Sequence, residues 1–303
     1  MEMKLGNEPR EDSGGAGPSL RPTITLAEVV DLYQRFATDL KRVRNFQKHL
    51  YDCIGEPEVE RRLKRILPLG LDPFDDRGGW IWGFAERMWS RIRPDFLYMH
   101  PMFDDLDSEI TYLLVRQSRP ETIVEISPKG GWSTSWLLHA VNDNNRGTVY
   151  SYDLIDTARK LIPESLRAGH WVFEKGDVRS AKLPSTIDYL FIDSLHTGEF
   201  ARWYTTTLFP RLSRNAPVSV DDVCRGRNTF FLDQPLDSPG PSEAEVVLSC
   251  LAARGILHFT VAPTVSRGTF NRVNEVRGQL GFGEDIHSSK KNQAVFFRWP
   301  GDR

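Results

Sequence analysis

The strongest constraint on the fold is a regular alternation of strand-like and helix-like segments that begins at residue 122. Short runs rich in β-branched and aromatic residues alternate with segments whose apolar residues recur every three or four positions. Such an order is typical of βαβ units, which build a mostly parallel sheet covered by helices on both faces. It predicts a doubly wound α/β domain with seven strands. The predicted strands are 122–127, 148–154, 171–175, 189–193, 217–220, 258–262 and 294–299, and the predicted helices are 104–116, 132–141, 157–166, 198–212 and 243–254.

A helical region precedes this domain. Apolar residues spaced by three or four positions from Leu26 to Ile54 predict one long helix over 24–54, and a shorter basic helix follows at 57–67. The apolar seam of the long helix suits either a contact in a homo-oligomer or packing on its own domain.

The remaining segments complete the predicted organisation. Residues 68–103 are rich in proline, glycine and aromatic residues, and the aromatic stretch 80–98 suits either a lid over a substrate or a small core between helices. Residues 1–22 hold almost nothing apolar, which predicts a disordered tail. The predicted division is a tail at 1–22, an N-terminal helical and aromatic-rich lid region at 23–103, and a ligand-binding α/β domain at 104–303.

Composition excludes several classes of protein. The 303 residues carry a formal net charge of only −2, whereas a nucleic-acid-binding protein usually has a strong basic excess. No apolar run approaches the length that spans a bilayer, and the first residues lack the apolar core of a secretory signal. Cys53, Cys224 and Cys250 are too widely spaced for a disulfide framework or a metal knuckle. We therefore expect a cytoplasmic protein whose partner is a small molecule, with neither nucleic acid nor membrane as a partner.

Three successive strand ends carry residues that suit a nucleoside-containing cofactor. Gly130 and Gly131 lie in a turn between a strand and a helix, where the backbone can approach a ligand closely. Asp153 ends the next strand about 20 residues later, a position that suits ribose hydroxyls. Asp177 ends the third strand and is followed by Val178. Each feature alone is also compatible with an ordinary tight turn.

This combination resembles the class I S-adenosylmethionine-dependent methyltransferases, over residues 104–299. The resemblance implies a Rossmann-like domain that binds S-adenosylmethionine. It departs from the family at Ser127, where the first glycine of the turn is usual. The cofactor-binding residues that the resemblance implies are Glu125, Gly130, Gly131 and Ser133 around the methionine part, Asp153 at the ribose, Asp177 and Val178 at the adenine, and Asp193 beside them.

Acidic residues also end two strands that should be neighbours. Asp193 ends one strand, and Asp221 and Asp222 end the next. Because the carboxyl ends of parallel strands lie side by side, the three carboxylates should converge, and carboxylates that converge repel one another unless a cation lies between them. Oxygen ligands suit Mg²⁺, Mn²⁺ or Ca²⁺. His196 follows Asp193 by three residues and suits a general base. The alternatives are that Asp193 caps the helix that follows it, and that Asp221 and Asp222 lie in a solvated turn.

The same residues resemble the metal-dependent O-methyltransferases of the catechol type and of the macrocin and mycinamicin sugar type. That resemblance implies Asp193, Asp221 and Asp222 as metal ligands, with Mg²⁺ the first expectation, and His196 as the base. The predicted function is methylation of a hydroxyl on a small molecule, a specialised metabolite. The alternatives are a metal-independent N-methyltransferase of a small molecule or peptide, and a cofactor-binding subunit without catalysis.

Overall fold

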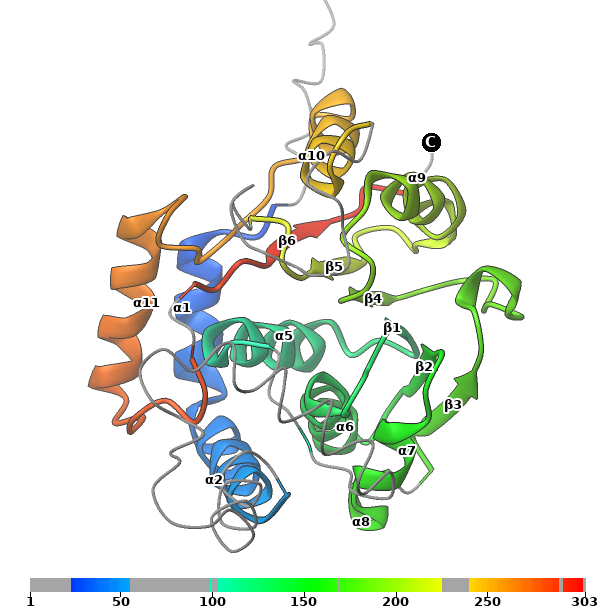
Figure 1. Ribbon diagram of the computed structural model, residues 1–303. Helices are drawn as coiled ribbons and strands as arrows, with labels where there is room; N and C mark the ends of the chain where they lie inside the picture. The colour runs from blue at the N-terminus through cyan, green and yellow to red at the C-terminus, as the bar shows by residue number, and fades with distance from the viewer. Residues whose placement is uncertain are drawn as a thin grey trace, which may run out of the picture.

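The computed structural model describes residues 23–54, 99, 103–167, 169–224, 240–288 and 291–301. Within this part, six strands form one sheet in the order β3-β2-β1-β4-β5-β6, in which the first five are parallel and β6 is antiparallel to β5 (Figure 1). The predicted doubly wound α/β class is therefore confirmed. The strands are β1 Thr122–Ile126, β2 Thr148–Asp153, β3 Trp171–Lys175, β4 Tyr189–Ile192, β5 Pro217–Val220 and β6 Val295–Arg298.

The predicted seventh strand at 258–262 is wrong. In this segment Phe259 forms one isolated antiparallel bridge with Phe296 of β6, and the pairing then stops. The hydroxyl of Thr260 donates to the carbonyl of Ala294 and accepts from the amide of Ala262, so a side chain replaces the backbone ladder at that point. Pro263 follows and has no amide hydrogen to continue a strand.

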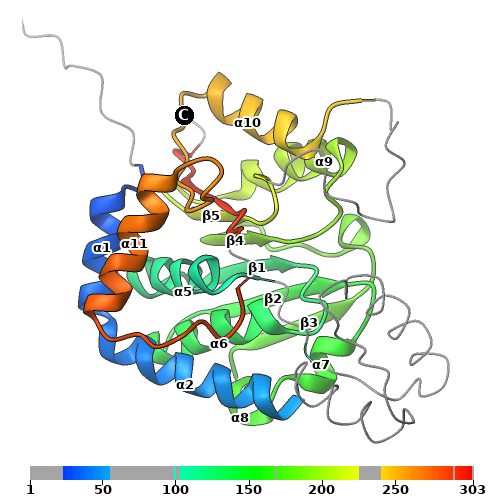
Figure 2. The same cartoon turned by 60° about the vertical axis from the view of Figure 1, so that its left-hand side comes forward.

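Helices cover both faces of the sheet. The alternation of side chains along a strand places Tyr189 and Phe191 in the core under α5 and α6, and Leu190 and Ile192 in the core under α9 and α10. Helices α1, α2 and α11 extend the first core, and α1 lies beside α11 (Figure 2). The helices are α1 Leu26–Arg35, α2 Ala37–Ile54, α5 Asp105–Ser118, α6 Trp132–Asn144, α7 Thr157–Leu161, α8 Glu164–Arg167, α9 Gly198–Thr207, α10 Glu243–Ala253 and α11 Arg267–Gln279, with 3₁₀ turns at Val178–Ser180 and Phe209–Arg211.

Three predicted helices are interrupted. The segment 24–54 breaks at Phe36, whose ring lies under the guanidinium groups of Arg35 and Arg116. The segment 157–166 breaks before Pro163, and 198–212 becomes a 3₁₀ turn around Pro210, because proline cannot continue the helical hydrogen bonds. Helix α11 was not predicted.

The apolar face of α1 and α2 is buried within the same chain. Tyr33, Leu40 and Val43 have no exposed surface, and Gln47 of α2 donates to Ser135 of α6. Packing on its own domain, one of the two sequence alternatives, accounts for the buried seam, and a homo-oligomer through these helices stays a prediction.

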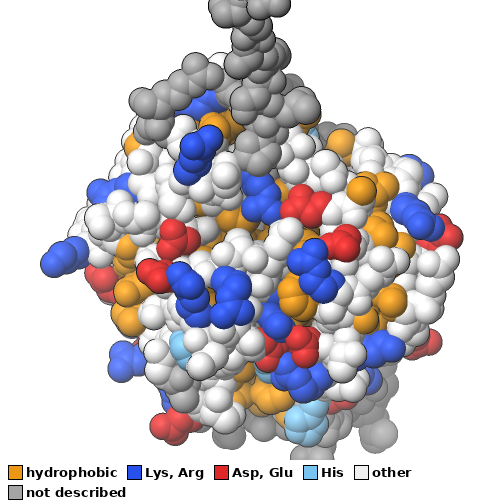
Figure 3. All heavy atoms as spheres, turned by 180° about the vertical axis from the view of Figure 1, so that it is seen from behind, with side chains coloured by type: hydrophobic (Ala, Val, Ile, Leu, Met, Phe, Trp, Pro, Cys, Tyr) orange, Lys and Arg blue, Asp and Glu red, His pale blue; other side chains and the backbone are white. Residues whose placement is uncertain are grey.

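Several predictions concern residues outside the described part of the chain. They are the tail at 1–22, the basic helix at 57–67 and the aromatic segment at 80–98. Among the described helices, none combines the length and apolar character needed to cross a membrane. Figure 3 shows one face of the surface, on which basic and acidic side chains lie close to one another.

Candidate active site

The strand order reverses between β1 and β4, at the centre of the sheet. The connection after β1 leads through α6 to β2 on one side, whereas β4 lies on the other side, so the chain changes direction here. Ser127 follows β1 with a left-handed φ of 63°, and its hydroxyl donates to Ser194 after β4 over 2.9 Å. Ser127 thus adopts the backbone conformation that glycine favours, and the departure from the family pattern leaves the turn intact.

The predicted methionine-side residues lie around the turn after β1. Glu125 is fully buried and accepts hydrogen bonds from the hydroxyls of Ser133, Thr134 and Ser151. Burial raises the pKa of Glu125 to about 7, and the hydroxyl donors oppose that shift. Glu125 and Ser133 therefore join β1 and β2 to the start of α6, and their contact with a cofactor stays a prediction.

The backbone conformation of the turn favours glycine at position 131. Gly131 has a φ of 89°, and a Cβ added to it would lie 2.8 Å from the side chain of Ile162. A side chain at this position would therefore collide with the segment after α7. Gly130, its buried neighbour, stays a predicted cofactor contact.

Asp153, the last residue of β2, and Asp177, two residues after β3, both accept hydrogen bonds from backbone amides. Asp153 accepts from the amides of Lys129, over 2.7 Å, and Ile155, over 3.1 Å, and so fixes the turn after β1. Asp177 accepts from the backbone and guanidinium of Arg179, which holds its pKa below the usual value. Both acids lie at the predicted strand ends, and Val178 follows, buried. Their roles at ribose and adenine stay predictions.

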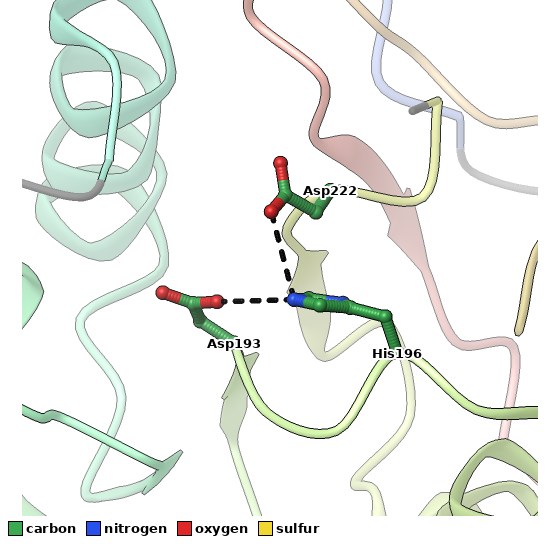
Figure 4. A group of neighbouring side chains, drawn as sticks. All are labelled: Asp193, His196 and Asp222. Atoms are coloured by element: carbon green, nitrogen blue, oxygen red, sulfur yellow. Dashed lines mark ion pairs between the residues drawn. The ribbon is translucent and has the colours of Figure 1, made fainter. Parts of the chain in front are cut away.

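The chemical end of the sheet brings three predicted residues together. Asp193 follows β4, His196 follows three residues later, and Asp222 follows β5 (Figure 4). His196 Nε2 lies 3.7 Å from Asp193 Oδ1 and 3.5 Å from Asp222 Oδ2. The three ligand atoms all lie within 4.8 Å of one another. A left-handed φ of 57° at Asp222 turns the chain where its side chain meets the histidine.

Asp221 is not part of this closest group. It is 4% exposed, and burial together with the charges of Asp193, Asp222 and Asp107 raises its pKa well above the usual value. Asp107 of α5 is an acid that the sequence analysis missed. It is also buried, and one of its carboxylate oxygens has no hydrogen-bond partner in the described part of the chain. Its only sequence signal was its place in the first turn of a predicted helix.

The second nitrogen of His196 contacts a residue that was also missed. Nδ1 lies 2.9 Å from Oε2 of Glu243, the first residue of α10, and the hydroxyl of Tyr204 donates to the other oxygen of Glu243 over 2.9 Å. Burial alone would lower the pKa of His196, but Glu243, Asp193 and Asp222 raise it above its usual value. No sequence signal linked Glu243 to His196.

The donor set fits a divalent cation. Asp193, after β4, and Asp222, after β5, offer carboxylate oxygens at one sheet edge, and the nearby His196 nitrogen can serve as a base beside them. Carboxylates suit Mg²⁺ or Mn²⁺, and a cation among them would offset the repulsion between negative charges that are close and partly buried.

A family comparison matches the segment that contains the central strands. Residues 124–223, from β1 to the turn after β5, match the family model described as a methyltransferase domain. This match agrees with the predicted methyltransferase, and the matched segment includes Asp193, His196 and Asp222.

Solved structures with distant similarity include two O-methyltransferases. One is TomG of Streptomyces achromogenes in complex with SAM, at 14% identity over 81% of this chain and 96% of that chain, with a TM-score of 0.46. The other is from Bacillus cereus in complex with SAH, at 14% identity over 80% and 96% of the two chains, with a TM-score of 0.46. No curated protein matches this chain significantly in sequence. Likenesses at this distance do not identify a substrate.

Proposed function

We propose that the methyltransferase moves the methyl group of S-adenosylmethionine to a hydroxyl oxygen of a small molecule, a specialised metabolite, with a divalent cation bound at the site. The observation that carries this proposal is the convergence of Asp193, His196 and Asp222, whose ligand atoms lie within 4.8 Å of one another. Asp221, buried beside them, adds a third carboxylate to the proposed metal site.

The proposed chemistry follows from the neighbours of His196. A bound divalent cation would lower the pKa of a substrate hydroxyl. His196 would accept the hydroxyl proton at Nε2, and Asp193 and Asp222, at 3.7 and 3.5 Å, would stabilise the charged imidazole. The oxygen would then attack the sulfonium methyl carbon, so that a C–O bond forms as the C–S bond breaks and S-adenosylhomocysteine leaves. Positioning and charge placement would supply most of the rate.

The cofactor would lie at the carboxyl ends of β1 and β4, where the strand order reverses. The turn at 127–131 and the carboxylates of Asp153 and Asp177 lie at the carboxyl ends of β1, β2 and β3, on one edge of the sheet. This edge is where open α/β sheets bind their ligands. Asp193, after β4, would lie between the cofactor and the substrate.

Methyl transfer from labelled S-adenosylmethionine tests the proposal. A panel of catechols, sugars and polyketide alcohols, together with amines, is incubated with the enzyme in Mg²⁺ or in EDTA. We expect methylation on oxygen that EDTA abolishes and Mg²⁺ restores. His196→Gln should lower the rate by about 10² to 10⁴-fold, as expected for loss of a general base.

Glu199→Gln is the matched control, because Glu199 is an exposed carboxylate in the first turn of α9, three residues after His196. It should retain the wild-type rate. Equal rates in Mg²⁺ and EDTA, or methylation on nitrogen, would contradict the proposal and favour the metal-independent N-methyltransferase.

A further inference from the structure

We infer that Glu243 is a positioning residue for His196: it accepts the Nδ1 proton and so leaves the Nε2 lone pair facing the space between Asp193 and Asp222. This inference rests on the proposed function, because it matters for catalysis only if His196 acts as the base. What it predicts directly is the tautomer and the orientation of the His196 ring.

The contacts of Glu243 support this assignment. Its side chain is buried, with an exposed fraction of 5%. Both carboxylate oxygens have a polar neighbour among the described residues: Oε2 lies 2.9 Å from His196 Nδ1, and Oε1 accepts from the Tyr204 hydroxyl over 2.9 Å. An ionised carboxylate can only accept hydrogen bonds. If Glu243 is ionised, the proton in the His196–Glu243 contact resides on Nδ1, and in the neutral ring Nε2 then keeps its lone pair.

The opposite side of the ring offers competing acceptors. Nε2 lies 3.7 Å from Asp193 and 3.5 Å from Asp222, both longer than the 2.9 Å contact of Nδ1 with Glu243. If Nε2 of the neutral ring carried the proton, His196 could not accept a substrate proton there. A strong acceptor at Nδ1 prevents that arrangement, as carboxylates next to catalytic and metal-binding histidines commonly do.

The fold holds Glu243 in place through the backbone. Thr197 and Ser242 form an isolated antiparallel bridge, which joins the residue after His196 to the residue before Glu243. At Gly198, an added Cβ would lie 1.9 Å from the carbonyl oxygen of Pro241, so only glycine permits this approach of the two segments. The starts of α9 and α10 are therefore fixed against each other at the site.

A helix-capping role does not explain Glu243. Acidic residues stabilise the first turn of a helix from an exposed position, and the capping box of α10 is already formed by Ser242 and the exposed Glu245. Burying a second carboxylate costs free energy unless it is paired. The pairing with His196 and Tyr204 offsets that cost.

Nitrogen-15 NMR of the histidine rings tests the inference. Full-length protein labelled in histidine is loaded with S-adenosylhomocysteine and measured in EDTA and in Mg²⁺, at a pH where the ring is neutral. The His196 signals are those missing from His196→Gln. We expect protonated Nδ1 and unprotonated Nε2 in the wild type. A wild-type ring protonated at Nε2 would overturn the inference, whatever the variants do.

The variants separate positioning from a general structural role. Glu243→Ala should move the proton to Nε2, where Asp193 and Asp222 accept it, and Glu243→Gln should retain it on Nδ1 through the amide oxygen. Glu245→Gln is the matched control on the same helix and should give the wild-type spectrum. An unchanged His196 signal in folded Glu243→Ala would contradict the inference.

Kinetics distinguish this inference from the proposed function. With an acceptor identified, Glu243→Ala should lower kcat by about 10 to 100-fold with little change in KM, the range seen when an outer hydrogen-bond partner is lost. If the NMR result holds but neither O-methylation nor metal binding is observed, the proposed function fails and the placement of the ring stands. If O-methylation is observed but Glu243→Ala leaves kcat unchanged, the inference fails alone.

Discussion

His139 is a buried titratable residue whose state should set how the protein responds to acid. It lies on α6, is 5% exposed and packs edge-on against Phe46 of α2, with ring centroids 4.7 Å apart. Burial lowers the pKa of His139 to about 4. Between pH 6.5 and 4 the unfolded chain therefore binds a proton that the folded chain does not, and the free energy of unfolding falls as the pH falls through this range.

We expect His139 to contribute up to about 3 kcal/mol to this loss, from a shift of about two and a half pKa units. Urea unfolding at pH 7, 5.5 and 4 measures it. His139→Leu should flatten the acid side of the stability profile, whereas His49→Leu, at an exposed position on α2, should follow the wild type. Parallel profiles for wild type and His139→Leu would refute the assignment.

At the scale of single residues, the sequence predicted which side chains lie close together when they follow the ends of neighbouring strands. Asp193, His196 and Asp222 could be grouped because neighbouring parallel strands end at one edge. Glu243 could not be grouped with them, because it lies 47 residues after His196 and reaches it only through the close approach of Pro241 to Gly198. Such an approach depends on tertiary packing.

At the scale of elements, a buried network of charges attaches α11 to the domain. Glu109 of α5 has no exposed surface and accepts from Arg277 of α11, from Arg44 of α2 and from the hydroxyl of Tyr33 of α1. Removing the carboxylate would leave two guanidinium groups buried without their main partner. One carboxylate thus joins four helices.

We predict that Glu109→Leu lowers the free energy of unfolding by about 3–5 kcal/mol, the usual cost of breaking a buried ion pair. Glu275→Ala is the control, because its ion pair with Arg272 lies on the same α11 at about half exposure and should contribute at most about 1 kcal/mol. Urea unfolding measures both. A similar small effect for the two variants would show that the network adds no stability.

The same network explains why α11 escaped sequence analysis. Only Val273, Val276 and Arg277 of this helix are buried, so its sequence has little apolar periodicity. The apolar repeats of α5, α6 and α9 were sufficient for prediction, since those helices bury a continuous face on the sheet. A helix held by ion pairs lacks that pattern.

At the scale of the whole molecule, the order of strands and helices predicted the sheet but not its edge. Central strands such as β1 and β4 are buried on both faces and mostly apolar, and they were recognisable from composition alone. The segment around Phe259 has a similar composition, but the Thr260 hydroxyl ends its pairing after one bridge. The strand propensity of a segment does not reveal that one of its side chains will end the backbone pairing.

The proposed mechanism depends on a cation bound by the acids at the carboxyl ends of β4 and β5. The most direct test is a calorimetric titration of Mg²⁺ into the full-length protein saturated with S-adenosylhomocysteine, for the wild type, Asp222→Asn and the control Glu199→Gln. We predict one saturable site per chain in the wild type and the control, and its loss in Asp222→Asn, which keeps the shape of the side chain but not its charge. Absence of saturable binding in the wild type, or equal binding in Asp222→Asn, would contradict the metal-dependent mechanism.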